Sequence, residues 1–281
     1  MSPLISPALL TNWLEQGDVV VFDCRFELSD PSAGRRHYEA GHIQGAWFAD
    51  LNADLSDLSK PGHGRHPLPE PEQLGEFLNA RGVARATRVV AYDAKDSLFA
   101  SRLWWLLGWL GHSQRFVLDG GLARWCGEGH AVPPKSPAWP QAQALAYRAD
   151  STQLIESDVV HAALKRGQLN LIDARGAPRF QGLTEPLDRI AGHVPGARNR
   201  PHSENLDASG RFKSESALAA EWAALERDPI QQPLAVMCGS GVTACHHLLA
   251  RAHAGLAPAL LYADSWSGWI SDPDRPIATG P

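Results

Sequence analysis

Short runs of apolar residues alternate along this chain with longer amphipathic stretches. The runs VVVFD, RVVAYD and RFVLD in the first half, and LNLID, PLAVMC and ALLYAD in the second, have the length of buried strands. Several of the amphipathic stretches end in glycine, which favours the left-handed backbone that closes a helix. Strands that alternate with helices predict α/β domains, each with a parallel sheet flanked by helices.

The same pattern occurs twice. VVVFDCR is echoed by LNLIDAR, and GHIQGA by GHVPGA. Equivalent positions lie at nearly constant offsets, which are 150 residues for Asp23 and Asp173, 151 for His42 and His193, and 145 for Asp93 and Cys238. The chain is therefore interpreted as a tandem duplication. We predict a first domain over residues 1–130, a proline-containing linker over 131–150 and a second domain over 151–281.

Composition narrows the class of protein. Hydrophobic residues make up 44% of the 281 residues and charged residues 20%, which provides enough apolar surface for two cores. We expect Trp104, Trp105 and Trp109 to pack a helix into one of them. The net charge of −5 argues against a basic surface for nucleic acid or anionic membranes. The start of the chain lacks a signal-peptide pattern and no apolar run is long enough to span a membrane, so a cytoplasmic protein is expected.

The four cysteines are scattered, at positions 24, 126, 238 and 245. No C-x-x-C pair occurs, and the spacing from Cys238 to Cys245 is too wide for a zinc knuckle. The pattern predicts reduced thiols, with no metal and no cofactor. Cys24, Cys126 and Cys245 are predicted to be structural.

Cys238 stands out because of its neighbours in the sequence. It ends an apolar run, two glycines then flank Ser240, and a helix is expected from about Val242. Ligands of open parallel sheets bind beyond the carboxyl ends of the strands. A glycine turn and a helix start there direct N–H groups at one point, which favours an anion such as a thiolate. We therefore predict a nucleophilic Cys238 in a loop made by Gly239, Ser240, Gly241, Val242 and Thr243.

The first copy has Asp93 where the second has Cys238, in the segment AYDAKDSLF, and its glycine turn is missing. This asymmetry predicts one active site, carried by the second domain. His42, His193, Asp23 and Asp173 occur in both copies, so we interpret them as architectural rather than catalytic.

The tandem GH-[IV]-x-GA segments, the thiol found only in the second copy and the loop CGSGVTAC resemble the two-domain rhodanese family. Within that family the loop is similar to the 3-mercaptopyruvate sulfurtransferase branch, since thiosulfate-preferring members usually carry basic residues after the cysteine. The resemblance covers nearly the whole chain. It implies two rhodanese-like domains and a transferase that carries a sulfane sulfur as a persulfide on Cys238.

The resemblance also implies substrate-binding residues. Arg179, in DARGAPRFQG, matches the family's carboxylate-binding arginine, and Arg189 is a shifted candidate for the second one. His66, in GRHPLP, matches a histidine that the family links to the loop serine and to an aspartate. Asn52 stands where that aspartate is expected, between Asp50 and Asp54, so no relay is assigned.

The expected donor is 3-mercaptopyruvate, and the expected acceptor is cyanide or a thiol such as thioredoxin or glutathione. Thiosulfate is the alternative donor, and a non-catalytic persulfide carrier is a further alternative. A cysteine phosphatase is discounted, because its phosphate-binding arginine would fall at Ala244.

Overall fold

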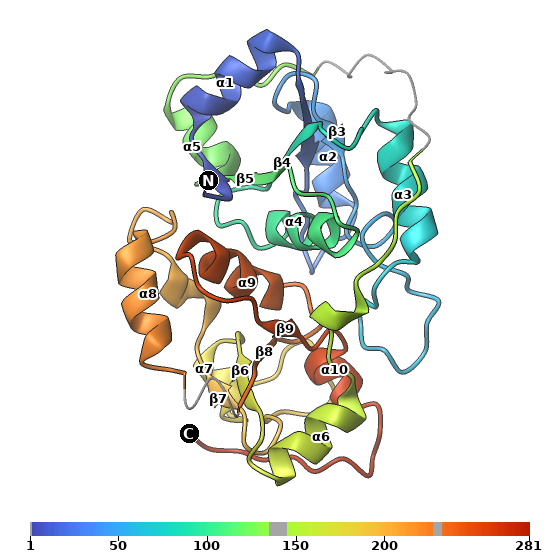
Figure 1. The fold of residues 1–281 in the computed structure, drawn as a ribbon, viewed down its shortest axis with the longest axis vertical. Helices are drawn as coiled ribbons and strands as arrows, with labels where there is room; N and C mark the ends of the chain where they lie inside the picture. Colours follow the sequence, from blue (N-terminus) through green and yellow to red (C-terminus); the bar gives the residue numbers. More distant parts are fainter. Residues whose placement is uncertain (1, 135–144, 227–231) are drawn as a thin grey trace. The chain divides into compact units, whose positions relative to one another are not determined.

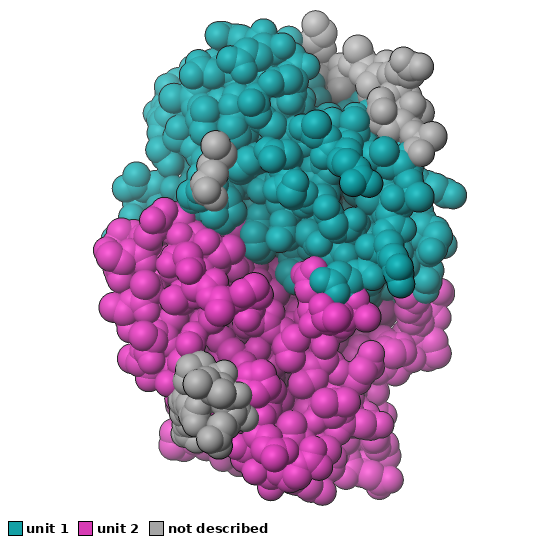
Figure 2. Space-filling model, in the orientation of Figure 1, with its two compact units in different colours: residues 1–57, 68–150, 207–212 teal, residues 58–67, 151–206, 213–281 magenta. Residues whose placement is uncertain are grey.

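The computed structural model describes residues 2–134, 145–226 and 232–281. These residues form two compact units (Figure 2). Unit 1 comprises residues 1–57, 68–150 and 207–212, and unit 2 comprises residues 58–67, 151–206 and 213–281. Ten residues of the expected linker, 135–144, lie outside the described residues. Each unit is thus made mostly, though not entirely, of one half of the chain.

Unit 1 contains a five-stranded parallel sheet in the order β1-β5-β4-β2-β3 (Figure 1). Its strands are β1 (Leu4–Ile5), β2 (Val19–Asp23), β3 (Trp47–Phe48), β4 (Arg88–Tyr92) and β5 (Arg115–Leu118). The three runs predicted in this half are β2, β4 and β5, which are the longest strands of the sheet. β1 and β3 have two residues each, too few for an apolar run to be recognisable in the sequence.

Helices cover both faces of this sheet. They are α1 (Pro7–Gln16), α2 (Ala33–Ala40), α3 (Pro71–Ala80), α4 (Ala100–Trp109) and α5 (Gly121–Gly127). Val21 shares one hydrophobic cluster with Trp13 of α1 and Trp125 of α5. Phe22, which points to the other face, packs against Phe77 of α3 with 5.6 Å between ring centroids. The predicted tryptophans at 104, 105 and 109 are buried on α4, as expected.

Unit 2 repeats the arrangement with a four-stranded parallel sheet in the order β7-β6-β8-β9. Its strands are β6 (Asn170–Asp173), β7 (Arg198–Asn199), β8 (Leu234–Met237) and β9 (Leu260–Leu261). A parallel bridge from Leu154 to Leu261 occupies the place where β1 pairs with β5 in unit 1. Both sheets confirm the predicted α/β fold and its duplication.

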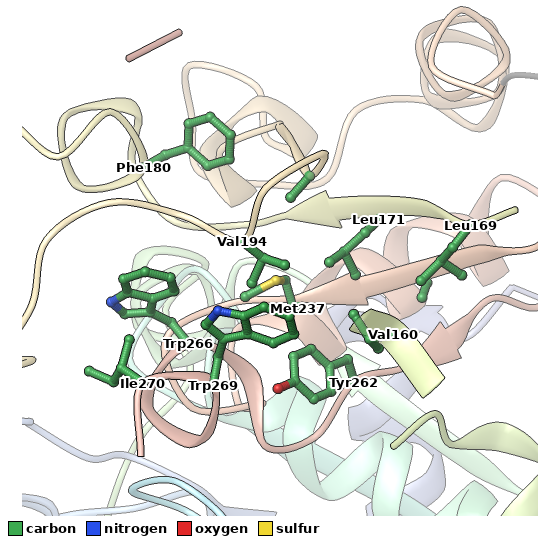
Figure 3. Packing of buried hydrophobic residues seen from close by; sticks show 12 residues of the cluster. Val160, Leu169, Leu171, Phe180, Val194, Met237, Tyr262, Trp266, Trp269 and Ile270 are labelled. Carbon is green, nitrogen blue, oxygen red and sulfur yellow. The ribbon is translucent and has the colours of Figure 1, made fainter. Parts of the chain in front are cut away.

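The helices of unit 2 are α6 (Ser157–Lys165), α7 (Ala177–Phe180), α8 (Glu215–Ala223), α9 (Ala244–His253) and α10 (Ser265–Trp269), with short 3₁₀ turns at Ser151–Gln153 and His202–Asn205. Figure 3 shows the core on the α6 and α10 side, where Met237 of β8 lies beside Trp269. Trp266, Trp269 and Tyr262 are completely buried there. This core fixes the end of β8 and the start of α10, the two segments that meet at the predicted site.

The repeated charged residues make the same contacts in both units. In unit 1 the Nη2 atom of Arg25 donates to the Asp23 carboxylate at 2.6 Å and to the Gly41 carbonyl at 2.7 Å. The equivalent bonds in unit 2 join Arg175 to Asp173 at 2.7 Å and to Gly192 at 2.8 Å. These ion pairs anchor the strand β2 or β6 to the next segment of its unit, so their role is architectural.

The repeated histidines are equally alike. Nδ1 of His42 lies 2.7 Å from the Tyr38 carbonyl, and the two rings stack with centroids 4.0 Å apart. Nδ1 of His193 lies 2.8 Å from the Phe180 carbonyl, and those rings stack at 3.8 Å. The prediction that both histidines are structural is therefore supported in each unit. Among the described residues, no helix combines the length and apolar character that a membrane crossing requires.

Candidate active site

Cys238 comes directly after β8 and is buried, with 2% of its surface exposed. Its amide donates to the hydroxyl of Ser265 at 3.0 Å, and its carbonyl accepts the amide of Trp266 at 3.0 Å. Ser265 has a positive φ of 54°, which is rare for a residue with a side chain. The start of α10 therefore holds both polar groups of the Cys238 backbone.

The loop after Cys238 makes the turn that its glycines predicted. Gly241 has a φ of 76°, and a Cβ atom at this position would lie 2.3 Å from the carbonyl oxygen of Ala263. Both the backbone angle and the close approach of the chain require glycine. The helix α9 begins at Ala244, two residues later than expected, because residues 242 and 243 still belong to the turn.

A segment distant in sequence reaches this loop. Residues 58–67, here named the arm, lie between β3 and α3 in the sequence but belong to unit 2. The Arg65 amide donates to Ser267 Oγ at 3.0 Å, and Ser271 Oγ donates to the Gly62 carbonyl at 3.1 Å. Gly64, with a φ of 81°, packs so closely that a Cβ atom would lie 2.7 Å from the Asp264 carbonyl. The arm is thus attached to α10 and its flanks through its backbone.

The arm places His66 beside the loop. Nδ1 of His66 and Oγ of Ser240 lie 2.8 Å apart and share a hydrogen bond, and each residue is only 6% exposed. Two predicted site residues separated by 174 positions are therefore in contact. The carboxylates of Asp50 and Asp54, the candidates for a third member, accept backbone amides of their own turn in unit 1.

Arg179 lies on α7, close to the backbone of the loop. A Cβ atom on Gly239 would be 3.4 Å from its Nη2 atom. The guanidinium pairs with Glu185 at 2.7 Å and with Asp188 at 3.1 Å. Burial raises the pKa of Glu185, but the hydrogen bonds from Arg179 and from two backbone amides outweigh it and lower that pKa overall. Arg179 therefore lies beside the loop, held by two carboxylates, and its role in substrate binding stays a prediction.

Arg65 lies beside the loop as well, although it was not predicted from the sequence as a site residue. A Cβ atom on Gly239 would lie 2.9 Å from the Nη2 atom of Arg65, so this guanidinium is as near the loop as that of Arg179. It forms an ion pair with Asp188. The available signal was its position directly before His66 in GRHPLP, although nothing local indicates that the arm reaches Gly239.

Arg189 points elsewhere. Its Nη2 atom donates to the backbone carbonyl of Ile270, just after α10. This contact ties the segment that carries Asp188 to the end of α10. Among the described residues, the Arg189 guanidinium is thus bonded at the end of α10, and its role in substrate binding stays a prediction.

The other thiols have different surroundings. Cys24 is buried, and burial, with the nearby charge of Asp23, raises its pKa well above the usual value. Cys245 is buried on α9 and its Sγ lies 3.3 Å from the Gly241 carbonyl. Cys126, predicted to be structural, is exposed at the end of α5. In the part of the chain that the structure describes, no group of three or more His, Cys, Asp or Glu could hold a metal ion.

The equivalent loop of unit 1 contains an anion of its own. The buried carboxylate of Asp93 accepts four backbone amides, from Lys95 (3.2 Å), Ser97 (3.0 Å), Phe99 (2.9 Å) and Ala100 (3.2 Å). Burial, helped by the charge of Asp96, raises the pKa of Asp93 to about 6. At neutral pH the carboxylate is therefore ionised, and the amides of the turn surround a negative charge.

Both units match one known sequence family. The model of the Rhodanese-like domain matches residues 6–128 and 156–272, which together cover most of the chain. The chain belongs to the rhodanese family. The second of these rhodanese-like matches contains Cys238, whereas the arm, which is part of unit 2, falls within the first.

Relatives of this rhodanese family member resemble it over its full length. A probable 3-mercaptopyruvate sulfurtransferase of Pseudomonas aeruginosa is 44% identical over 279 residues, which is 99% of this chain and 98% of the relative. A putative thiosulfate sulfurtransferase of Mycobacterium tuberculosis is 36% identical over 99% of this chain and 97% of its own. The crystal structure of a 3-mercaptopyruvate sulfurtransferase of Escherichia coli is 29% identical, with a TM-score of 0.81 over 95% of this chain and all of that one.

Proposed function

We propose that this protein is a 3-mercaptopyruvate sulfurtransferase, which moves a sulfane sulfur from that donor through a Cys238 persulfide to cyanide or a thiol. The observation that carries the proposal is the 44% identity, over nearly both full lengths, to a probable 3-mercaptopyruvate sulfurtransferase. The geometry of the Cys238 loop supports it. Thioredoxin and glutathione are the thiol acceptors that we expect.

The first half of the reaction loads the enzyme. The Cys238 thiolate attacks the sulfur of 3-mercaptopyruvate, so that an S–S bond forms and the C–S bond breaks. The electron pair of the broken bond leaves with carbon as the enolate of pyruvate, which then takes up a proton. In the second half, an acceptor thiolate or cyanide attacks the outer sulfur, and the Cys238 thiolate leaves.

The loop amides stabilise the negative sulfur in both halves. The loop of unit 1 supports this role, because a turn at the same place in the repeat surrounds the Asp93 carboxylate with four amides. In unit 2 the residue at this place is a thiol, so the charge is that of the thiolate or of the persulfide. Fixed dipoles of this kind act without reorganising during the reaction.

The side chains around the loop would orient the donor. Arg179 is the proposed partner for the substrate carboxylate, since a guanidinium binds a carboxylate through two parallel hydrogen bonds. Ser240 would donate a hydrogen bond to the ketone or carboxylate oxygen, while its own oxygen accepts the bond from Nδ1 of His66. Carboxylate recognition away from the sulfur agrees with a loop that has no charged residue from Gly239 to Thr243.

Thiosulfate remains the second candidate donor. It is favoured by the 36% identity to a putative thiosulfate sulfurtransferase and by the two guanidinium groups next to Gly239, which could also bind a sulfonate. The ratio of kcat/KM for the two donors decides between them. We expect the ratio to favour 3-mercaptopyruvate.

Mass spectrometry of Cys238 tests the proposal directly. The reduced protein is exposed separately to 3-mercaptopyruvate and to thiosulfate, and the peptide that contains Cys238 is examined for one additional sulfur atom. Loading by 3-mercaptopyruvate with release of pyruvate is expected. A protein loaded only by thiosulfate is a thiosulfate sulfurtransferase, and one loaded by neither small donor but by a persulfide-bearing protein is a carrier.

A further inference from the structure

The arm brings a second cation to the loop. Its backbone is fixed by the bond from the Arg65 amide to Ser267 and by the tight packing of Gly64 on Asp264. The position of Arg65 is therefore set by main-chain contacts that do not depend on its own side chain. This fixed backbone carries the guanidinium of Arg65 to the Cys238 loop.

Two guanidinium groups converge on Gly239, the residue after Cys238. A Cβ atom on Gly239 would lie 2.9 Å from Nη2 of Arg65, and 3.4 and 3.6 Å from the two terminal nitrogens of Arg179. A side chain at position 239 would enter the space that both groups occupy. The glycine thus leaves room for both guanidinium groups beside the loop.

One buried carboxylate holds both cations. Asp188, whose side chain is 3% exposed, pairs with Arg65 and with Arg179, and the second acid, Glu185, pairs with Arg179. The arginine side chains keep more exposure, 28% for Arg65 and 20% for Arg179. Each guanidinium has five N–H donors, so its bonds to these carboxylates leave further donors for a ligand. Two cations are thus prearranged on the accessible side of two buried acids.

We propose that Arg65, together with Arg179, binds the anionic group of the sulfur donor, and that Arg65 rather than Arg189 is the second substrate cation. This inference rests on the proposed function and adds a residue to its site. Arg65 is the closer candidate, because its guanidinium lies next to Gly239, whereas that of Arg189 donates to the Ile270 carbonyl just after α10.

The test uses Arg65→Gln and Arg65→Lys in the full chain, with Arg166→Gln as a matched control. Arg166 is an exposed arginine of unit 2, bonded to Gln168 at the end of α6. Because a charge-assisted hydrogen bond is worth about 1.5–3 kcal/mol, Arg65→Gln should raise the KM for 3-mercaptopyruvate by about 10- to 150-fold. Arg65→Lys should recover part of this loss, and Arg166→Gln should leave KM unchanged.

Two further measurements separate binding from folding. The persulfide form of each variant is discharged by a thiol acceptor, and this rate should not change in Arg65→Gln, because the donor has already left. The affinity for pyruvate, measured by calorimetry, should fall in Arg65→Gln and not in Arg166→Gln. A melting temperature near that of the wild type shows that the arm is still attached.

Three results would overturn the inference. They are an unchanged KM in Arg65→Gln, equal losses in the loading and discharge steps, or a larger rise of KM in Arg189→Gln than in Arg65→Gln. If the wild type is loaded by no donor, the proposed function fails. The pyruvate affinities of the wild type and Arg65→Gln then decide the role of Arg65 by themselves.

Discussion

The loops that begin at Asp93 and at Cys238 occupy the same place in the repeat, yet their first residues make different hydrogen bonds. In unit 1 the carboxylate of Asp93 takes four amides of its own turn. In unit 2 the first residue is a thiol, and its own amide is bonded to Ser265. One turn therefore directs its amides at a carboxylate of its own, whereas the other begins with a thiol.

The two loops share their attachment to the fold although they begin with different residues. In both units the loop comes after a parallel strand, β4 or β8, and is bonded to the start of a later helix, α5 or α10. Leu122 donates its amide to the Asp93 carbonyl at 2.9 Å, just as Trp266 does to Cys238. A carboxylate that accepts the amides of its own turn makes that turn a structural element.

Removing the thiol should have the largest effect. Cys238→Ser should lower sulfur transfer by more than about a thousandfold, because the serine hydroxyl is a weak nucleophile and forms no persulfide. Steady-state release of pyruvate measures the loss. The matched control is Cys126→Ser, which removes an exposed thiol of unit 1 and should retain full activity. Equal activity in the two variants would remove Cys238 from the mechanism.

The backbone of the active loop should be the next most sensitive feature. Gly241→Ala would place a methyl group 2.3 Å from the Ala263 carbonyl in a backbone with φ of 76°. The clash and the strained angle should together lower the free energy of unfolding by about 3 kcal/mol or more. Urea denaturation measures this change.

Gly255→Ala provides the control for that clash. Gly255 also has a positive φ, 69°, but no atom lies within 4 Å of its expected Cβ position. Its substitution should cost only the backbone term, about 1 kcal/mol. If both variants lose the same stability, the close approach at Ala263 is not what requires glycine at 241.

The free energy of unfolding should depend on pH through the buried carboxylate of Asp93 in unit 1. Burial, with the charge of Asp96, raises the pKa of Asp93 from 3.8 in the reference state to about 6. The folded protein therefore keeps this proton over a range in which the unfolded chain has lost it. Its contribution to stability is complete below about pH 4 and declines by roughly 3 kcal/mol as the pH rises through about 6.

Asp93→Asn isolates this contribution because it cannot titrate. The difference in unfolding free energy between the wild type and Asp93→Asn should shift against the wild type as the pH rises from about 4 to about 7. Urea titrations at both pH values measure the shift. A difference that does not depend on pH would mean that Asp93 has an ordinary pKa in the folded protein.

The smallest effect is expected at the second residue after Cys238 and after Asp93, the residues with which the two loops begin. Ser240→Ala removes the hydroxyl bonded to His66 and should lower kcat/KM by about tenfold, the value of one hydrogen bond to a charged group. The equivalent residue of unit 1 is Lys95, and Lys95→Ala should leave kcat/KM unchanged. A loss in both variants would indicate a general effect on folding rather than a role of Ser240.

Much of the fold was predictable because its signals are local. The six apolar runs became the six strands expected, and the repeat placed Asp93 opposite Cys238. The glycine turn after Cys238 was also predictable, since Gly241 needs a positive φ that few other residues adopt. By contrast, β1, β3 and β7 were not predicted; each has only two residues, as does β9, which the run ALLYAD did indicate.

The second guanidinium next to Gly239, that of Arg65, was harder to predict because it depends on contacts between distant segments. Arg189 is close in sequence to Arg179, but its side chain is bonded to the carbonyl of Ile270. Arg65 is far from Gly239 in the sequence, and only the bonds of the arm to Ser267 and Ser271 bring it there. Spacing along the chain cannot reveal such an attachment.

The arm also affects how the two halves of the sequence relate to the two units of the structure. Residues 58–67 fall within the first rhodanese-like match, but they complete the unit that contains Cys238. A gene cut between the two copies would leave residues 151–281 with the thiol and without Arg65 and His66. The two halves of the sequence are therefore not two self-contained units, because the first half supplies a segment of the unit that contains Cys238.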